Sequence, residues 1–176
     1  MKSMLLLASM LTVSSAAFAV DPLQGIPAEV AKRHQLFIDE KSCEPDSVFA
    51  STVQDLGKGN KLVNVNCTMG AYQGSDKVYL FNPNEGNTVT DVIVLRSNGK
   101  GAVIGTSDIG SAGYEEKTHI LYSQSKGRGI GDCGMSSRSK LTMTDYGSVE
   151  VKTVEIRHKI NCDEKMNPWP VVFKQK

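Results

Sequence analysis

The residues with the richest chemistry lie in one stretch, residues 126–134, which reads Lys-Gly-Arg-Gly-Ile-Gly-Asp-Cys-Gly. It holds four of the sixteen glycines, two cations, an acid and a cysteine. Consecutive glycine amides can form an anion-binding nest, to which Lys126 and Arg128 would add positive charge. We favour the alternative, a tight structural loop whose glycines adopt positive φ while Cys133 is held in a crosslink. For Asp132, binding to local backbone amides and binding to a ligand are equally good interpretations.

Residues 129–134 also match the dinucleotide-binding pattern G-x-G-x-x-G. That fingerprint needs a strand before it and a helix after it, because the N-terminus of the helix holds the phosphates. Residues 135–140 (MSSRSK) lead instead into a further predicted strand. We therefore reject a nucleotide site, and the sequence predicts no cofactor.

The chain has four cysteines, Cys43, Cys67, Cys133 and Cys162, and no C-x-x-C pair. An even count in an exported chain predicts two disulfides. Of the three possible pairings we prefer Cys43–Cys67 with Cys133–Cys162, because each then closes one local segment. The cysteines and the three histidines are too widely spaced to predict a metal site.

Recognisable catalytic patterns are missing from the sequence, which has neither a G-x-S-x-G elbow nor an HExxH motif. With all cysteines expected in disulfides, a thiol nucleophile is also disfavoured. One acid–base group remains to be considered. A Cys133–Cys162 bond would bring Asp132, Asp163 and His158 towards one another.

Two aromatic residues are candidates for recognition. Tyr72 ends the stretch 67–72 (CTMGAY), and we interpret it as half-buried packing, with a ligand platform as the alternative. Trp169, the only tryptophan, lies between Pro168 and Pro170, which hold the chain extended. It either caps the core, which we favour, or anchors a partner.

The N-terminus has the features of a secretion signal. Lys2 precedes an apolar run, residues 4–13, and Ala17-Phe18-Ala19 fits the small-x-small cleavage rule. The run is about half as long as a membrane span requires. We therefore predict a signal peptide over residues 1–19, export to the periplasm, and one domain over residues 20–176 without a membrane span.

Charge disfavours two classes of partner. Twenty basic and nineteen acidic residues give a net charge of +1, and removal of Lys2 with the signal peptide leaves nineteen of each. There is no long block of one sign, which nucleic-acid binders and polybasic membrane binders usually have.

Hydrophobic periodicity predicts two helices, over residues 28–39 and 44–56. Beyond them the period becomes alternating, with residues 101–113 expected to be loop. The predicted strands are 61–67, 77–81, 88–96, 115–123, 141–143, 149–151 and 153–161, with hairpin turns at Asn98-Gly99 and at residues 145–148. This order predicts an α+β fold: two N-terminal helices, then an antiparallel sheet of six or seven strands, crosslinked by two disulfides.

The stretches 67–72 and 126–134, the late Cys162 and the pair Trp169-Pro170 together resemble a family of exported bacterial proteins described only as domain of unknown function 1176 (DUF1176). The resemblance covers most of the chain from Cys43 onwards. It implies a periplasmic, disulfide-bonded domain. It implies no activity, because the family is itself uncharacterised.

We therefore expect a non-catalytic periplasmic protein that works by binding, since loops on a rigid scaffold are where recognition concentrates. One version is an inhibitor or immunity-type protein that inserts the loop 126–134 into a partner's cleft; a small anionic ligand is the other partner considered. The candidate binding residues are Lys126, Arg128, Asp132, Tyr72 and Trp169. In this view Arg128→Ala weakens binding without loss of stability. The alternative is a small periplasmic hydrolase acting on an envelope component.

Overall fold

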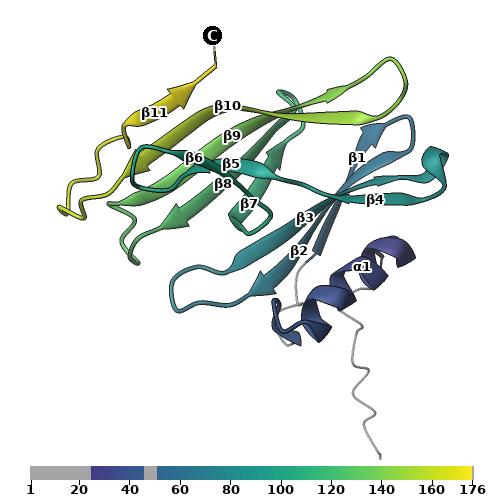
Figure 1. Ribbon diagram of the computed structural model, residues 1–176, viewed down its shortest axis with the longest axis horizontal. Helices are drawn as coiled ribbons and strands as arrows, with labels where there is room; N and C mark the ends of the chain where they lie inside the picture. Colours follow the sequence, from purple (N-terminus) through teal and green to yellow (C-terminus); the bar gives the residue numbers. More distant parts are fainter. Residues whose placement is uncertain (1–24, 46–50, 176) are drawn as a thin grey trace, which may run out of the picture.

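The computed structural model describes residues 25–45 and 51–175, which form one α-helix, eleven strands and a short 3-10 turn (Figure 1). The helix is α1 (Ala28–Asp39). The strands are β1 (Ser51–Gly57), β2 (Asn60–Thr68), β3 (Ser75–Asn82), β4 (Thr88–Asp91), β5 (Val94–Ser97), β6 (Val103–Thr106), β7 (Ile109–Glu115), β8 (Ile120–Lys126), β9 (Gly134–Met143), β10 (Val149–Lys159) and β11 (Val171–Lys174).

The strands form one large antiparallel sheet and one separate hairpin. The large sheet runs β1-β2-β3-β7-β8-β9-β10-β11, with β4 paired to β3, while β5 and β6 pair with each other. The ladder between β3 and β7 contains only two residue pairs, Ser75–Gly110 and Asp76–Ile109. This short ladder joins a β1–β4 part to a β7–β11 part, as Figure 1 shows.

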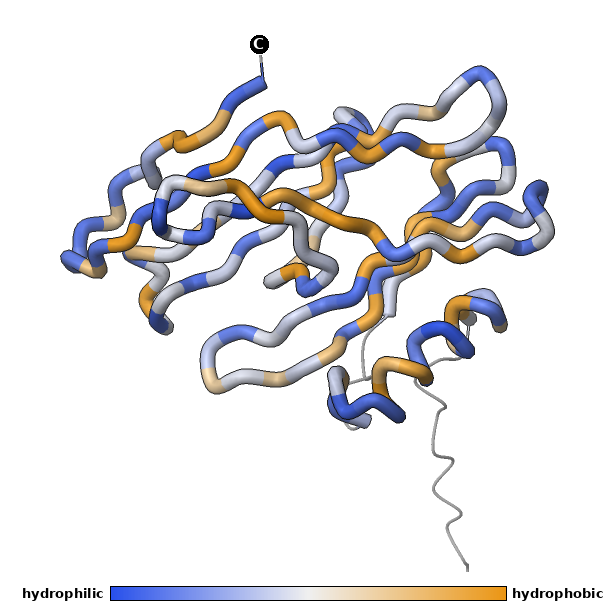
Figure 2. The backbone as a smooth tube through the Cα atoms, viewed as in Figure 1, coloured by the Kyte–Doolittle hydropathy of each residue, from blue (hydrophilic) through white to orange (hydrophobic). Residues whose placement is uncertain are grey.

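Two apolar clusters lie on the opposite faces of β2. One face packs Val63 and Val65 against α1 together with Tyr79 and Phe81 of β3. The other face contributes to the main core between the two parts of the sheet. That core contains Leu62, Val78, Val92, Val94, Ile109, Leu121 and Leu141. Figure 2 shows apolar segments converging in the middle of the molecule.

Helix α1 has the bounds that the sequence predicted. Its Val30 and His34 are fully buried against the sheet. The Nδ1 atom of His34 lies 2.8 Å from the Tyr79 hydroxyl, so His34 is a packed and hydrogen-bonded residue. Burial, followed by the positive charge of Lys77, lowers the pKa of His34 below its usual range.

The predicted fold class is wrong, because the described chain has one helix and eleven strands rather than two helices and six or seven strands. The second predicted helix, 44–56, is the main error. Residues 51–56 belong to β1, which pairs antiparallel with β2, while residues 46–50 lie outside the described part. Val53 and Leu56 have helical spacing, but Val53 lies opposite Val63 while Leu56 packs against the main core. Non-local strand pairing overrides the local period here.

Residues 101–113 were expected to be loop but contain β6 and most of β7. Their glycine content misled the prediction. A Cβ atom on Gly110 would lie 2.2 Å from the Gln124 carbonyl oxygen, so this glycine permits the close approach of β7 and β8. The single strand predicted over 88–96 divides into β4 and β5, which belong to different sheets. The two predicted hairpins, β5–β6 and β9–β10, are confirmed.

Both preferred disulfides form. Cys43 bonds to Cys67, with Cα atoms 4.5 Å apart, and Cys133 bonds to Cys162, with Cα atoms 4.8 Å apart. Two disulfides indicate an oxidising environment of the kind met by exported proteins. No helix among the described residues is long and apolar enough to cross a membrane. The predicted signal peptide lies outside the described residues.

Candidate binding surface

The loop between β8 and β9, residues 127–133, is tied to itself and to the C-terminal segment. The amide of Gly127 donates to the Cys133 carbonyl at 2.9 Å, closing the base of the loop. The amide of Gly131 donates to the Arg128 carbonyl at 2.9 Å. The Cys133–Cys162 disulfide then fixes the loop to the chain beyond β10. Two of the glycine amides are thus bonded internally, which favours the structural interpretation of this loop over an anion nest.

An ion pair clamps the same loop from within. The Nε and Nη2 atoms of Arg128 donate to the two carboxylate oxygens of Asp132 at 2.8 and 2.7 Å. The Asp132 side chain is fully buried, and its Oδ2 also accepts the Glu164 amide at 2.6 Å. The hydrogen bonds from Arg128 hold the pKa of Asp132 well below its usual range. Asp132 therefore binds the loop to the C-terminal segment and has its oxygens occupied.

Glycines in the loop are needed for close packing. A Cβ atom on Gly127 would lie 2.8 Å from the sulfur of Cys133, and one on Gly134 would lie 2.2 Å from the Ser125 carbonyl oxygen. A Cβ atom on Gly129 would lie 2.7 Å from the ring of Tyr72. The glycine at 129 therefore lets the two stretches singled out in the sequence, 67–72 and 126–134, meet face to face.

Gln73, which the sequence analysis did not single out, fixes this meeting. Its side-chain amide donates to the Ser111 hydroxyl at 2.9 Å and to the Gln124 carbonyl, and its Oε1 accepts the Lys126 amide at 2.7 Å. The loop between β2 and β3 is thereby bound to β7 and β8. No spacing rule in the sequence predicts this role, because the partners lie 38 to 53 positions away.

A groove of about 350 Å³ lies where these two loops meet. Tyr72 and Lys126 line it, together with Arg96 from β5, which the sequence analysis missed. Among the described residues, neither the Arg96 guanidinium nor the Lys126 ammonium has a hydrogen-bonding or ion-pair partner. The acid in the groove, Asp108, already pairs with Lys77 at 2.5 Å. The groove therefore offers two uncompensated positive charges.

Two large side chains stand out from this region. Tyr72 is 72% exposed, rather than half-buried as expected, and Ile130 at the tip of the β8–β9 loop is 57% exposed. We call Tyr72, Arg96, Lys126 and Ile130 the loop surface. It combines apolar and cationic groups. The clamp, the disulfide and Gln73 hold the backbone of Tyr72, Lys126 and Ile130, while Arg96 is contributed by β5.

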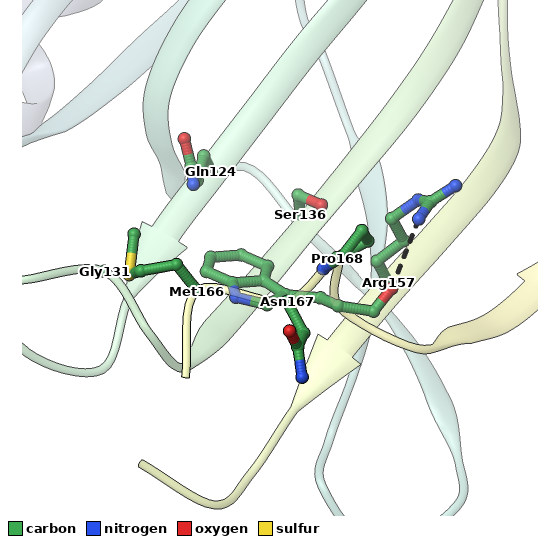
Figure 3. Close-up of a pocket in the computed structure, with 8 residues that line it drawn as sticks. Gln124, Gly131, Ser136, Arg157, Met166, Asn167 and Pro168 are labelled. Carbon is green, nitrogen blue, oxygen red and sulfur yellow. Dashed lines mark hydrogen bonds between the residues drawn. The ribbon is translucent and has the colours of Figure 1, made fainter. Parts of the chain in front are cut away.

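Trp169 is buried, with 9% of its surface exposed, in agreement with the packing role that we favoured. A hollow of about 300 Å³ lies beside it, lined in part by Gly131, Ser136 and Met166. Figure 3 shows Met166 on one side of this hollow and Arg157 on the other, with the hydrogen bond from Arg157 to the Trp169 carbonyl dashed. A contact between Trp169 and a partner stays a prediction.

The acid–base group considered from the sequence is not assembled. Asp132 is held within its own loop, and Asp163 accepts the Lys159 ammonium at 2.6 Å, which lowers the pKa of Asp163. His158 turns its Nδ1 to the Ser97 hydroxyl, 3.0 Å away. No hydrogen bond joins any two of these three residues in the part of the chain that the structure describes.

A cluster of ligand-type side chains also lies at the base of the loop. The ligand atoms of Asp132, Cys133 and Cys162 lie within 4.8 Å of one another. Both sulfurs are in a disulfide and therefore offer no thiolate, and the Asp132 carboxylate is bonded to Arg128. In the oxidised protein this cluster is a crosslink, not a ligand set.

The fold and the loop define a disulfide-bonded antiparallel β protein with an internally bonded β8–β9 loop. The model of a family described as "Protein of unknown function (DUF1176)" matches residues 12–176, nearly the whole chain, and the chain belongs to this family. No curated protein and no solved structure matches the chain. The resemblance noted in the sequence is thus confirmed, and the family description assigns no activity.

Proposed function

We propose that this chain is a non-catalytic binding protein of the periplasm and that the loop surface is where it binds. The observation that carries the proposal is a contrast between neighbouring side chains: Arg128 and Asp132 are bonded inward, while Ile130 of the same loop and Tyr72 of the adjoining β2–β3 loop remain exposed. Aromatic and aliphatic groups on a fixed backbone are typical anchors of protein interfaces.

Rigidity supports this proposal energetically. A loop that is already ordered loses little conformational entropy on binding, so more of its contact energy appears as affinity. The disulfide at Cys133, the Arg128–Asp132 clamp and the Gln73 bonds all order the backbone that carries Tyr72 and Ile130. This is the way in which inhibitor-type proteins present a loop to a partner's cleft.

Charge indicates the chemistry of the partner. Arg96 and Lys126 line the same groove and lack acidic partners in the described chain. A carboxylate or phosphate placed there would complete charge-assisted hydrogen bonds with both. The partner group is therefore anionic and lies beside an apolar one, whether it belongs to a periplasmic protein or to a small molecule.

The test compares matched variants of the mature, oxidised protein in capture from a periplasmic extract. Tyr72→Ala and Lys126→Gln should lose a partner that the wild type captures. Tyr146→Ala and Lys152→Gln should retain it, because Tyr146 is 95% exposed on the distant β9–β10 turn and Lys152 is exposed on β10.

Inorganic phosphate and glucuronate, titrated with glucose as the uncharged control, distinguish a small-molecule ligand from a protein. Binding of either anion that is lost in Lys126→Gln would identify a small anionic ligand. Capture by Tyr72→Ala and Lys126→Gln at the wild-type level, without anion binding, would refute the proposal.

A further inference from the structure

The hollow of about 300 Å³ beside Trp169 is a site distinct from the loop surface, since none of the four loop-surface residues lines it. We call it the Trp169 hollow. Its volume is at the small end of the range for ligand sites in proteins. The lining residues used below are Gln124, Ser136, Arg157, Met166, Asn167 and Trp169.

Strand pairing places three of these residues in one row. Gln124 of β8 lies opposite Ser136 of β9, and Ser136 lies opposite Arg157 of β10. Side chains directly opposite each other in an antiparallel pair point to the same face, with Cβ atoms about 5 Å apart. This row forms one wall of the hollow, and residues 166–169 form the other. Figure 3 shows Gln124 and Ser136 on the strands and Asn167 across from them.

The segment that carries Trp169 is fixed to β10. The Nη1 atom of Arg157 donates to the Trp169 carbonyl at 3.3 Å, and the His158 amide donates to the Pro170 carbonyl at 2.9 Å. The Cys133–Cys162 disulfide holds the start of the same segment. Both walls of the hollow are therefore ordered before any ligand binds, which lowers the entropic cost of binding.

Trp169 brings a hydrogen-bond donor without a partner. Only 9% of the residue is exposed, and its indole N–H bonds to no residue that the structure describes. The indole nitrogen is still not sealed from solvent, because it is not one of the solvent-inaccessible atoms that lack a partner in the described chain. A tryptophan buried to this extent usually has its N–H bonded. The accessible part of Trp169 thus offers an unused donor at the hollow.

Three further polar side chains at the hollow are accessible and unbonded. Gln124 and Asn167 are exposed and Ser136 is half-buried, and none of the three side chains makes a hydrogen bond within the described chain. Amide and hydroxyl side chains both donate and accept. Together with the indole N–H, they match a ligand that carries several donors and acceptors close to one another.

The charge of the lining is already neutralised. Arg157 is the only charged residue in the described lining, and it donates to both carboxylate oxygens of Glu155, at 2.7 and 3.4 Å. A carboxylate or phosphate would therefore meet no free cation here, in contrast to the loop surface. Met166, which is 70% exposed, adds an apolar contact. The lining thus favours an uncharged ligand with hydroxyl groups and apolar C–H groups.

We propose that the Trp169 hollow binds a neutral saccharide. Neighbouring hydroxyls on a sugar ring donate and accept at close spacing. They accept from the indole N–H of Trp169 and exchange hydrogen bonds with Gln124 and Ser136. Asn167 contacts the ligand from the opposite wall, and the C–H groups of the ring pack against Met166. The site differs from the loop surface in its residues and in the charge of its ligand.

The single tryptophan makes the test direct, because its indole N–H gives one resonance in the NMR spectrum of the intact oxidised protein. The probes are the methyl glycosides of glucose, galactose, mannose and N-acetylglucosamine. At least one should shift this resonance saturably and bind at least about tenfold tighter than tetrahydropyran, which has the ring without hydroxyls. Methyl glucuronide and the peptide-like N-acetylglycinamide should bind no tighter than that glycoside when followed by the same resonance.

Four results would overturn the proposal. They are an indole resonance that no glycoside moves, equal affinity for tetrahydropyran, tighter binding of the glucuronide, and tighter binding of N-acetylglycinamide.

Variants locate the site. Gln124→Met and Ser136→Ala remove unbonded polar groups, so each should leave the melting temperature unchanged and weaken the glycoside by up to about tenfold. Gln35→Met, at an exposed position of α1, is the matched control and should bind as the wild type does. Tyr72→Ala, in the loop surface, should also retain the glycoside. Wild-type affinity in both Gln124→Met and Ser136→Ala, or loss of binding in Tyr72→Ala, would place the sugar elsewhere and overturn the proposal.

Discussion

Two regions of the molecule differ in whether their polar groups are hydrogen-bonded. One is the loop surface, and the other is the cavity between β1–β3 and β7–β8, which Gln54 and Asn64 help to line. In the loop, Arg128 and Asp132 satisfy each other and the Glu164 amide, so the charged residues nearest the disulfide are committed to structure. In the cavity, Gln54 and Asn64 have oxygens that the described chain leaves without a donor. Within the glycine-rich stretch, Arg128 and Asp132 therefore shape the loop, whereas Lys126 lines the groove and Ile130 stays exposed. Two ordinary amides, on strands with no motif, keep buried oxygens that no described residue satisfies.

Removing one disulfide at a time should have the largest effect and should separate the two regions. Cys133→Ser with Cys162→Ser, and Cys43→Ser with Cys67→Ser, each release a crosslink of similar loop length, with separations of 29 and 24 residues. Each pair of substitutions should lower the free energy of unfolding by about 3.5 kcal/mol, measured by denaturant titration. Only the Cys133–Cys162 variant should also lose capture through the loop surface. Loss of capture in both, at equal residual stability, would mean that the disulfide does not hold the surface locally.

Arg128→Ala should destabilise the protein, contrary to the expectation from sequence that it would affect binding alone. The substitution leaves the fully buried Asp132 carboxylate without its cation. We expect the melting temperature to fall by on the order of 10 °C. Adding Asp132→Asn to this variant should recover part of the loss, because the unpaired charge is then removed. An unchanged melting temperature in Arg128→Ala would show that Arg128 does not stabilise the loop and is available for binding.

Two ranges of pH should report on two different parts of the molecule. Since burial lowers the pKa of His34, stability from this group is complete above its unfolded pKa of about 6.5 and is lost as pH falls below it, by up to about 1 kcal/mol per pH unit. The pKa of Asp132 is also lowered, so stability from its clamp is complete above the ordinary value of 3.8 and is lost only in stronger acid.

Denaturant titrations between pH 4 and 8 should therefore show a slope between pH 5 and 7 that disappears in His34→Gln and persists in Asp132→Asn. A slope that persists in His34→Gln and disappears in Asp132→Asn would show that His34 is not its source.

Gly129→Ala should have the smallest effect on stability and a larger one on binding. Its Cβ atom would lie 2.7 Å from the ring of Tyr72, which is exposed and free to move aside. The free energy of unfolding should change by less than about 1 kcal/mol. Capture through the loop surface should weaken, because Tyr72 loses its place. Unchanged capture would show that the packing of Tyr72 on Gly129 does not matter for binding.

Sequence patterns succeeded where structure is local. The period of α1 and the Asn98-Gly99 turn are set by neighbours along the chain, and both are confirmed. The preferred disulfide pairing, over separations of 24 and 29 residues, is also confirmed. The sequence-based predictions of secondary structure are wrong where pairing with another strand determines the structure. Residues 51–57 have a helical apolar period, yet β2 supplies an antiparallel partner for nearly every residue of β1. Residues 101–113 are rich in glycine and serine, yet pairing with β5 and β8 makes most of them strands.

The residues of the candidate site also divide into those that the sequence predicted and those that it missed. Tyr72 and Lys126 were selected from the sequence and meet in one groove. Gln73 and Arg96 were missed, because Gln73 bonds to residues that are distant in the chain and Arg96 meets the rest of the groove only in the folded protein. The pairing of Arg128 with Asp132, only four positions apart, was within reach of the sequence; the burial of Asp132 was not.

The sequence alone was enough to recognise the family and the first helix, to favour the disulfide pairing that forms, and to single out residues 126–134. These follow from residue type and short spacing, which the chain carries locally. The tertiary structure decided which side chains of that loop are bonded inward and which stay exposed, and it created the cavity between β1–β3 and β7–β8. Those properties depend on the register of strands from both ends of the chain, and register is fixed by burial and pairing across the whole sheet.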